Sequence, residues 1–315
     1  MLSLTPPTLL AVLRSMLPRH SRHQSGMLPA AGTPERERLV LAVKRCFGLT
    51  DTDLLSASSI TLEEWADALS ERGDISHLRL FDSATGGAFS HQLQRQHLYS
   101  AASLRQEAEA LRTLLAHESQ ASRSVVSWLS MQTAAGFMLG ALLPQQAGWS
   151  SRSLFDHANA LWELNAGDIM VTSADRWGQL AQRLPSLPMN ITAVSTSALD
   201  KHTYRSLLAK GVAHIIELHC QPGLGVLAAR RSRQAPFELL AHWHPTESDD
   251  YLLRMIQGGM PDEVQLAEPL RWVGARHFLP VIGEEGWVAE ESGPLGVSPA
   301  WQVPIQGDRP GASAA

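Results

Sequence analysis

Residues 168–219 read DIMVTSADRWGQLAQRLPSLPMNITAVSTSALDKHTYRSLLAKGVAHIIELH, and this stretch decides the fold. It contains three short apolar segments, DIMVTS, NITAVST and HIIELH, and the first two are each followed by an amphipathic segment, RWGQLAQRL and DKHTYRSLLAKG. Strands that alternate with helices of this length are typical of a parallel sheet covered by helices. The stretch therefore predicts a doubly wound α/β domain.

The α/β pattern extends in both directions from this stretch. Upstream, HLRLF and SVVSWLSM indicate strands, a long helix is expected from about Ser100 to His117, and AAGFMLGALLP indicates a buried helix or strand. After Arg233, the segments FELLAHWHP, YLLRMI and RWVGARHFLPVIG favour shorter, antiparallel strands. The predicted α/β domain occupies residues 74–300, and a flexible tail is expected over 301–315.

Residues 1–73 are predicted to form a small helical module. Apolar residues recur at helical spacing over 4–17, and a polar break with a glycine follows. Thr33 is followed by Pro-Glu, a typical start for a second helix, and Thr61 with Glu64 makes a capping-box pattern for a third.

The composition excludes several classes of protein. Of the 315 residues, 44% are apolar and 18% are charged, which argues against a disordered chain and leaves enough apolar surface for a large core. A net charge of −5 with dispersed arginines does not support nucleic-acid binding. Two cysteines without a CxxC spacing argue against a thiolate metal site and a disulfide framework. The longest apolar run, residues 134–143, is about half of a membrane span, so a cytoplasmic protein is expected.

Two glycine-containing segments are candidates for ligand binding. The first is DSATGGAF, from Asp82 to Phe89, whose backbone N–H groups and hydroxyls suit phosphate oxygens. A plain tight turn at Gly86 and Gly87 explains the same letters. The second is GLGVLA at 223–228, whose G-x-G-x-x-A spacing matches dinucleotide-binding turns. A backbone that turns closely beside a strand explains both glycines, and this interpretation is favoured.

His242 and His244 lie two positions apart and precede the acidic run from Glu247 to Asp250. Alternate residues of a strand share a face, so the two imidazoles and a nearby carboxylate can be drawn as a metal site. Two partly exposed strand histidines before a polar turn give the same pattern, and this interpretation is favoured. We assign no metal ligand, and the absence of G-x-S-x-G, Walker and H-E-x-x-H motifs leaves hydrolase and P-loop chemistry without support.

The order of these segments resembles the large N-terminal domain of adenylate-forming enzymes, the acyl- and aryl-CoA synthetases, and in particular the 4-coumarate–CoA-ligase-like proteins of aryl-polyene and related pigment clusters. The resemblance covers roughly residues 75–287 and is carried by SHQLQRQHLYSAASLRQEAEALRTLL, GFMLGALLP, AGDIMVTSADRWGQLAQRLP, ITAVSTSALDKHTYRSLLAKGVAHIIELH and PFELLAHW. It implies a mainly parallel, doubly wound sheet with a short antiparallel region, preceded here by the helical module.

The resemblance also implies where nucleotide and acid bind. The family's phosphate loop matches Asp82–Phe89 and its adenine and magnesium segment matches His219–Gly225. Nucleotide contacts are thereby assigned to Ser83, Thr85, Gly86, Gly87 and Gly225. The family's acyl pocket matches Met131–Gly136 and the ends of two strands. Pocket contacts are thereby assigned to Gln132, Thr133, Gly136, Ser195, Thr196 and His219.

Several positions depart from the family's pattern. Phe89 falls about where the family has a phosphate-binding Lys, Gly223 where it has a metal-binding Glu, and Gly274 near its ribose-binding Asp. The chain has only three lysines, none at a family position, and the C-terminal lid subdomain is expected to be absent. Loss of even one such donor costs orders of magnitude in rate. No catalytic residue is assigned, and ATP with Mg²⁺ is expected only if the altered site still binds it.

The favoured expectation is a degenerate acyl- or aryl-CoA ligase-like protein, a non-catalytic or repurposed subunit in secondary-metabolite or lipid-type biosynthesis. The alternative is an active ligase or acyltransferase of the same lineage that a partner completes or that uses a pre-activated thioester. Expected partners are an acyl carrier protein, a companion ligase and an acyl or aryl small molecule. The helical module resembles half of an acyl-carrier domain or is a docking extension. An unrelated α/β protein is the third interpretation.

Overall fold

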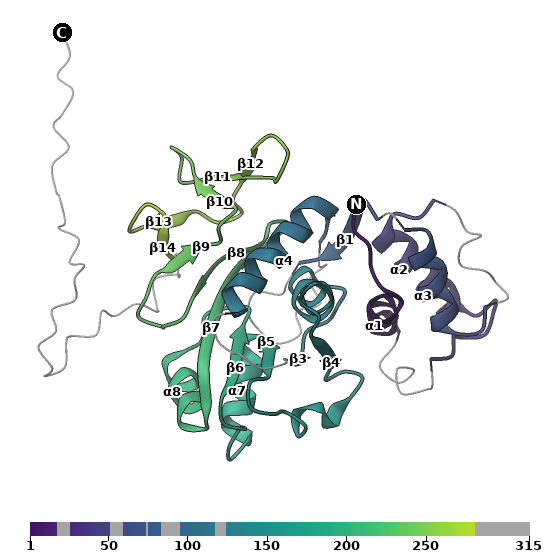
Figure 1. Cartoon of the computed structure of the whole chain (residues 1–315), viewed down its shortest axis with the longest axis horizontal. Coiled ribbons are helices and arrows are strands. Elements are labelled where there is room, and N and C mark those ends of the chain that lie inside the picture. Colours follow the sequence, from purple (N-terminus) through teal and green to yellow (C-terminus); the bar gives the residue numbers. More distant parts are fainter. Residues whose placement is uncertain (18–25, 51–58, 74, 83–94, 117–123, 281–315) are drawn as a thin grey trace, which may run out of the picture.

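The computed structural model describes residues 1–17, 26–50, 59–73, 75–82, 95–116 and 124–280 (Figure 1). Its helical elements are α1 (Pro6–Met16), α2 (Pro34–Phe47), α3 (Leu62–Glu71), α4 (Ala101–Ala116), α5 (Ala134–Phe137), the π-helical turn η2 (Met138–Leu142), α6 (Leu143–Ala147), the 3-10 turn η3 (Ala158–Leu161), α7 (Ala174–Arg183) and α8 (Lys201–Ala209). Its strands are β1 (His77–Phe81), β2 (Gln96–Ser100), β3 (Ser124–Ser127), β4 (Ser150–Ser153), β5 (Ile169–Thr172), β6 (Ile191–Ser195), β7 (Val212–Gln221), β8 (Gly225–Arg230), β9 (Phe237–Leu239), β10 (Trp243–Pro245), β11 (Tyr251–Arg254), β12 (Asp262–Gln265), β13 (Leu270–Trp272) and β14 (His277–Pro280).

Nine strands form one sheet in the order β13-β14-β9-β8-β7-β6-β5-β3-β4. Strands β4, β3, β5, β6 and β7 pair with their neighbours in parallel. Strands β8, β9, β14 and β13 continue the sheet from β7 with antiparallel pairs. Two smaller antiparallel sheets pair β1 with β2 and join β10, β11 and β12. The predicted mainly parallel α/β sheet with an antiparallel region is therefore confirmed.

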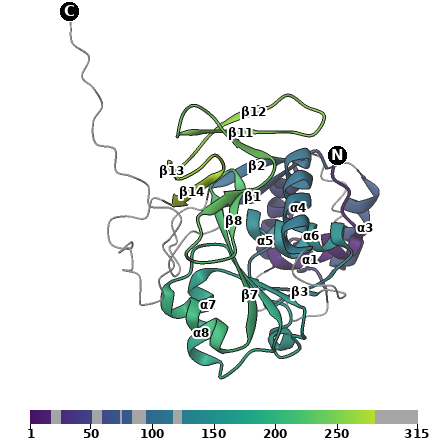
Figure 2. The ribbon, with the colours of Figure 1, turned by 60° about the vertical axis from the view of Figure 1, so that its left-hand side comes forward.

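The inner parallel strands β3, β5 and β6 bury both of their faces because helices cover each side (Figure 2). Adjacent residues of β3 point to opposite faces, so Val125 lies in the apolar cluster that contains α4 and α6, whereas Val126 lies in the cluster that contains α7 and α8. Helix α7 buries Trp177 and Leu180 at helical spacing, and the Trp177 Nε1 donates to the carbonyl of Val194 at 3.1 Å. The fold is thus doubly wound.

The three helices predicted before residue 73 are present, and side-chain caps begin two of them. Thr33 Oγ1 accepts a hydrogen bond from Arg36 N at 3.3 Å, and Thr61 Oγ1 accepts one from Glu64 N at 3.2 Å. The Glu64 carboxylate accepts in return from Ile60 N at 2.9 Å. Figure 1 shows α1–α3 beside β1, and one buried apolar cluster joins residues on both sides of residue 73. The division of the chain at this residue stays a prediction.

The helix after β3 contains a π-helical turn immediately before Pro144. Proline has no backbone N–H, so it cannot donate to the carbonyl one helical turn earlier, which is that of Gly140. That carbonyl accepts instead from Ser151 Oγ at 2.6 Å. The irregular turn thereby links the helix to β4.

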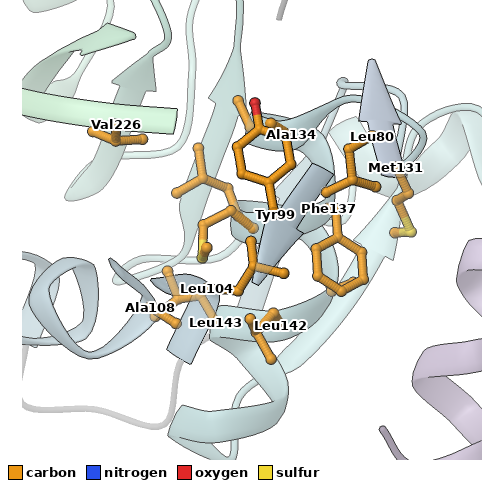
Figure 3. Packing of buried hydrophobic residues seen from close by; sticks show 14 of the residues in the cluster. Leu80, Tyr99, Leu104, Ala108, Met131, Ala134, Phe137, Leu142, Leu143 and Val226 are labelled. Atoms are coloured by element: carbon orange, nitrogen blue, oxygen red, sulfur yellow. The ribbon is translucent and has the colours of Figure 1, made fainter. Parts of the chain in front are cut away.

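Side chains from distant elements meet in the core around α4 and α5 (Figure 3). Leu80 of β1, Tyr99 of β2, Leu104 of α4 and Phe137 of α5 are each no more than 3% exposed, and Val226 of β8 reaches the same cluster. The core therefore joins the small β1–β2 sheet to the large one.

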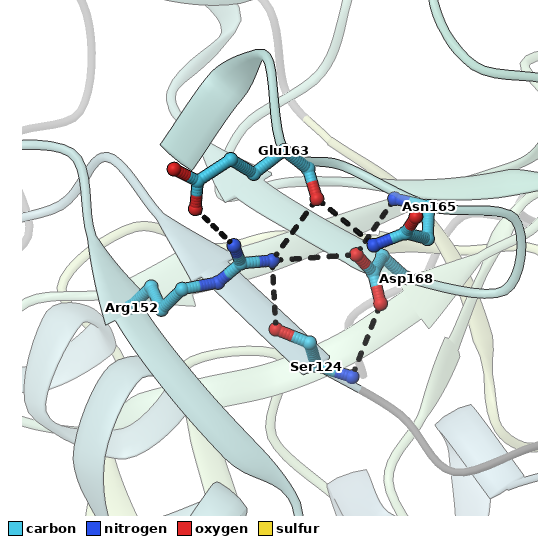
Figure 4. Close-up of polar contacts among 5 residues, drawn as sticks. All are labelled: Ser124, Arg152, Glu163, Asn165 and Asp168. Atoms are coloured by element: carbon cyan, nitrogen blue, oxygen red, sulfur yellow. Dashed lines mark hydrogen bonds and ion pairs between the residues drawn. The ribbon is translucent and has the colours of Figure 1, made fainter. Parts of the chain in front are cut away.

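Polar contacts tie together the amino ends of the parallel strands (Figure 4). Arg152 of β4 lies 2.8 Å from the carboxylate of Glu163 and 3.6 Å from that of Asp168, which precedes β5. Asp168 also accepts from Ser124 N at 3.3 Å and from Asn165 N at 2.9 Å. This network lies at the edge opposite to the carboxyl ends, where ligands of such sheets bind. None of the described helices is long and apolar enough to cross a membrane.

Candidate functional site

The turn between β7 and β8 is the centre of the candidate site. Gly223 and Gly225 have φ of +74° and +81°, which only glycine adopts without strain. Strand β8 follows the turn and pairs with β7 in the antiparallel direction. The dinucleotide-binding interpretation of the glycine spacing is wrong, because that motif requires a helix after the second glycine.

The turn meets the first residue of the predicted phosphate loop. Gly223 N donates to Asp82 Oδ1 at 3.2 Å, and His97 Nε2 lies 3.1 Å from the same carboxylate. A Cβ on Gly223 would lie 2.7 Å from His97 Nδ1, so the ring closes one side of the turn. The structure therefore brings Asp82 to the 223–225 turn. The loop residues Ser83, Thr85, Gly86 and Gly87 lie outside the described residues.

A buried carboxylate closes the other side of the turn. Glu107 of α4 is 5% exposed, and its Oε1 accepts from Val226 N at 2.9 Å. A Cβ on Gly225 would lie 2.4 Å from Glu107 Oε2. Burial raises the pKa of Glu107 to about 7, although the hydrogen bond from Val226 and the charge of Arg254 oppose the shift.

Arg254 and Tyr99 complete the surroundings of Glu107. Arg254 donates to the carbonyl of Leu224 at 3.1 Å, and its guanidinium lies 4.3 Å from the centre of the Trp243 ring. Burial lowers the pKa of Arg254, and burial together with the charge of Glu107 raises the pKa of Tyr99. The turn is thus enclosed by protein groups of both charges.

Comparisons with known proteins agree with the resemblance in the sequence. No family model matches the chain. A 4-coumarate–CoA ligase of Cereibacter sphaeroides is 26% identical over 219 residues, which are 67% of this chain and 53% of that relative. The chain is therefore similar in sequence to acyl-CoA ligases. The chain spans about half the length of the curated relative that it matches.

Solved structures share the fold of the ligase-like protein. An acyl-CoA synthetase (AMP-forming)/AMP-acid ligase II-like protein from Dyadobacter fermentans gives a TM-score of 0.51 at 12% identity, over 68% of this chain and 62% of that one. Apo MatB from Rhodopseudomonas palustris gives 0.45 at 15% identity, over 62% and 43%. The sequence similarity to the curated ligase confirms the predicted resemblance, and the Dyadobacter fermentans structure confirms the fold class.

Three predicted pocket residues lie at or just before the start of α5 and hold backbone segments together. Gln132 Nε2 donates to the carbonyl of Ser15 at 2.7 Å, and Thr133 Oγ1 caps α5 by accepting from Gly136 N at 3.2 Å. A Cβ on Gly136 would lie 1.9 Å from the carbonyl oxygen of Ser130. Gly136 is therefore required by the close approach of two backbone segments.

The other three predicted pocket residues lie near the carboxyl ends of β6 and β7. Ser195 Oγ donates to the carbonyl of Ser197 at 2.6 Å, and Thr196 N donates to that of Thr172 at 3.1 Å. His219 packs between the rings of Phe237 and Phe278, with centroid distances of 5.6 and 5.1 Å. Burial, and then the charge of Arg230, lower the pKa of His219 to about 4, and its Nε2 has no hydrogen-bond partner.

A large cavity in the described part of the chain is lined by residues other than the predicted pocket residues. Its volume is about 750 Å³, and it lies between the end of α4 and strands β8, β9 and β14. Its walls include Leu114, Ala229, Glu238, Leu240, Gly274 and His277. None of the six predicted pocket residues lines it, so their role in binding a ligand stays a prediction.

The two histidines near residue 243 differ from the expectation. His242 is 5% exposed, and its ring lies 5.4 Å from that of Trp243, whereas His244 is exposed. The expectation of two partly exposed strand histidines is therefore wrong for His242, which lies in the turn before β10. No group of three or more His, Cys, Asp or Glu in the described ranges is arranged to hold a metal ion.

Sequence analysis did not identify Glu107 or Arg254. The signal for Glu107 was present, because Leu104, Ala108 and Leu111 form the apolar stripe of α4 and Glu107 falls within it. A carboxylate at such a position must find a partner when the helix packs. The signal for Arg254 was weaker, since its partners Leu224 and Trp243 are distant in the sequence.

Proposed function

We propose that the ligase-like protein is a binding subunit that has lost the adenylation step of its relatives. The observation that carries the proposal is the closed turn at 223–225. Its Gly223 N–H is bonded to Asp82, and the N–H of Val226, which follows the turn, is bonded to Glu107. The backbone donors that a phosphate would use are occupied by carboxylates of the chain itself.

Charge at the turn also supports the proposal. A nucleotide triphosphate brings several negative charges, and like charges at short distance repel strongly where water is excluded. Asp82 and Glu107 approach the turn from opposite sides, while Arg254 is the cation that faces Glu107. A bound triphosphate would have to displace Asp82 and tolerate Glu107.

The missing metal-binding Glu of the family cannot be restored by a simple substitution. Gly223, which falls at that position by resemblance, has φ of +74°, and any Cβ there would meet His97 at 2.7 Å. A side chain would strain the backbone and push the His97 ring away from Asp82. The local structure is therefore adapted to the absence of this carboxylate, and a magnesium ion would lose a hard oxygen ligand.

We further propose that the protein acts in the cytoplasm, in secondary-metabolite or lipid-type biosynthesis. Its ligand would be an acyl or aryl small molecule, and its partner an acyl carrier protein or a companion ligase. Similarity to a 4-coumarate–CoA ligase supports the ligand class, and the three helices α1–α3 offer a surface for the partner.

The proposal is tested by pyrophosphate exchange with ATP, Mg²⁺ and a panel of aryl and fatty acids, with a full-length 4-coumarate–CoA ligase as the positive control. We expect no exchange above the blank and no saturable heat in a calorimetric titration with ATP and Mg²⁺. Exchange by the purified protein alone would overturn the proposal. Exchange that requires an added C-terminal ligase subdomain would favour the enzyme completed by a partner.

A further inference from the structure

The cavity at the end of α4, between that helix and strands β8, β9 and β14, has the size of a small-ligand site. Its volume of about 750 Å³ lies within the usual range for such sites. None of the residues that line it belongs to the 223–225 turn. An occupant of this cavity is therefore a second ligand, beyond the proposed function, and the inference does not rest on the loss of adenylation.

A row of three side chains from neighbouring strands lies on one face of the sheet in this cavity. Glu238 of β9 is directly opposite Ala229 of β8 and His277 of β14 in the antiparallel register. Directly opposite residues point to the same face, and all three line the cavity. The adjacent residues Phe237 and Phe278 point to the other face, where their rings stack at 5.8 Å. The register thus places a carboxylate and an imidazole next to each other in the cavity.

Both polar side chains of this row are accessible to a ligand. Glu238 and His277 are exposed residues, and both contribute to the lining of the cavity. No hydrogen bond or ion pair joins either side chain to another residue in the described ranges. A carboxylate only accepts hydrogen bonds, and a neutral imidazole has one accepting nitrogen. The cavity therefore offers a ligand two neighbouring acceptors.

The cations of the lining have negative partners elsewhere. Arg230 is paired with the buried carboxylate of Glu217, which compensates its charge. Arg231 Nη2 donates to the carbonyl of Leu114 at 3.1 Å, in the last turn of α4. The carbonyls at a helix C-terminus carry partial negative charge, which favours a cation there. Glu238, the carboxylate of the lining, is thus left to attract a positively charged ligand.

These features select a ligand class. We propose that this cavity binds a protonated primary amine with an apolar body. An ammonium group has three N–H donors and no acceptor, so it suits the neighbouring acceptors of Glu238 and His277. Aliphatic side chains form much of the remaining wall and would remove the apolar body from water. They belong to Leu114, Ala235, Pro236, Leu240, Ala241 and Val273.

Two analogues of the same shape fit the cavity less well than the amine. An alcohol has one O–H donor and no charge, and hydrogen bonds in which a partner is ionised are about twice as strong as neutral ones. A carboxylate has no donor for either acceptor, and the charge of Glu238 repels it. An acid that used Arg231 instead would bind more tightly than the amine, so the order of affinities distinguishes the two arrangements.

Titration of the full chain with 2-phenylethylamine, 2-phenylethanol and 3-phenylpropanoate, followed by ligand-observed NMR, tests the proposal. We expect the amine to bind about tenfold more tightly than the alcohol, and the acid more weakly than both. Glu238→Gln should weaken amine binding about tenfold and leave the alcohol unchanged, and His277→Phe should weaken the amine about threefold. The matched control is Glu263→Gln on β12, which removes an exposed carboxylate outside the cavity and should leave amine binding unchanged.

Thermal melting establishes that each variant is folded, and either of the two cavity variants suffices if the other does not fold. Equal or tighter binding of the alcohol or the acid would overturn the proposal. So would unchanged amine binding in a folded Glu238→Gln or His277→Phe variant, an equal loss in Glu263→Gln, or no saturable amine signal up to about 20 mM. Nucleotide binding is not part of the readout, so this test and the pyrophosphate exchange succeed or fail separately.

Discussion

The Oε1 atom of Glu107 accepts a 2.9 Å hydrogen bond from the backbone N–H of Val226, which ties the middle of α4 to the second residue of β8. The helix precedes the strand by more than a hundred residues in the chain. A titratable carboxyl group thus fixes the turn at 223–225, and its protonation bears on the stability of the whole fold.

Glu107→Gln should make stability less dependent on pH. The pKa of Glu107 is about 7 in the folded protein and 4.5 in the reference state, so the folded state binds the proton more tightly. This contribution is fully present below pH 4.5 and is lost as the pH rises through 7, a change of about 3 kcal/mol. Gln keeps the acceptor for Val226 N–H and removes the titration.

Urea denaturation of both proteins between pH 4.5 and 8 measures this effect. The free energy of unfolding of the Gln variant, relative to the natural protein, should rise by about 3 kcal/mol over this range. Other titrating groups cancel in the difference. A difference that stays constant with pH would show that Glu107 titrates normally.

His219→Phe should stabilise the protein in mild acid. The pKa of His219 is lowered to about 4, so the unfolded chain takes up a proton near pH 6.5 that the folded chain refuses. Stability from this residue is present above pH 6.5 and is lost as the pH falls toward 4. Phe fits the cluster with Phe237 and Phe278 and does not titrate.

The expected gain of the Phe variant between pH 7 and pH 5 is about 2 kcal/mol relative to the natural protein. Guanidinium denaturation at the two pH values gives the number. An equal loss of stability in both proteins on acidification would contradict the assignment of a neutral His219.

Gly136→Ala should be strongly destabilising. The added Cβ would lie 1.9 Å from the Ser130 carbonyl oxygen, so one of two backbone segments must move. We expect a loss of about 3 kcal/mol or more in the free energy of unfolding, or failure to fold. Gly178→Ala in α7 is the matched control, since its Cβ would lie 3.5 Å from Thr203 Oγ1.

The control should gain up to about 1 kcal/mol, because alanine favours the helix over glycine. Melting temperatures of the two variants check the contrast. Similar behaviour of the two alanine variants would mean that the Ser130 contact does not constrain residue 136.

Removal of one partner from the buried ion pair Glu217–Arg230 should cost more than removal of both. The side chains are 1% and 3% exposed, and they join β7 to β8. Glu217→Gln leaves the Arg230 charge without a counterion, which should cost about 3–5 kcal/mol. The double variant Glu217→Leu with Arg230→Met removes both charges and should recover most of that loss.

A double-mutant cycle of Glu217→Leu and Arg230→Met, each made singly and then together and measured by urea denaturation, separates these effects. If Glu217→Gln and the double variant lose the same free energy, the cost comes from lost packing, and the buried charge is not its source. The guanidinium of Arg230 also lies 4.5 Å from the centre of the Phe237 ring, and both Arg230 variants probe that contact.

The sequence predicted the elements that carry strong local patterns. The alternation in residues 168–219 is present as β5, α7, β6, α8 and β7, because the strands are continuous buried runs and the helices between them have a clear apolar period. Strands β2, β4, β8 and β12 were not predicted. Strand β4 reads SSRS, and it is a strand because β3 pairs with it in parallel. Such pairing is set by distant residues, which local periodicity does not contain.

Site prediction had a similar limit. The family resemblance assigned the loop that begins at Asp82 and the 223–225 turn to one nucleotide site. The hydrogen bond from Gly223 N to Asp82 joins the turn to the first residue of that loop. The resemblance did not predict Glu107 beside Gly225, since this contact depends on how α4 packs. A substitution such as Gly225→Trp would therefore collide with Glu107 and disturb the fold.

The π-helical turn at Met138–Leu142 holds one residue more than a regular α-helix would. If the same residues were wound as a regular α-helix, the segment after the turn would be rotated by up to about 100° about the helix axis. Gln145, which donates to the Ser3 carbonyl at 2.9 Å and accepts from Thr5 N at 2.9 Å, would then face away from the first residues of the chain. The extra residue of this turn thus decides where the beginning of the chain is attached.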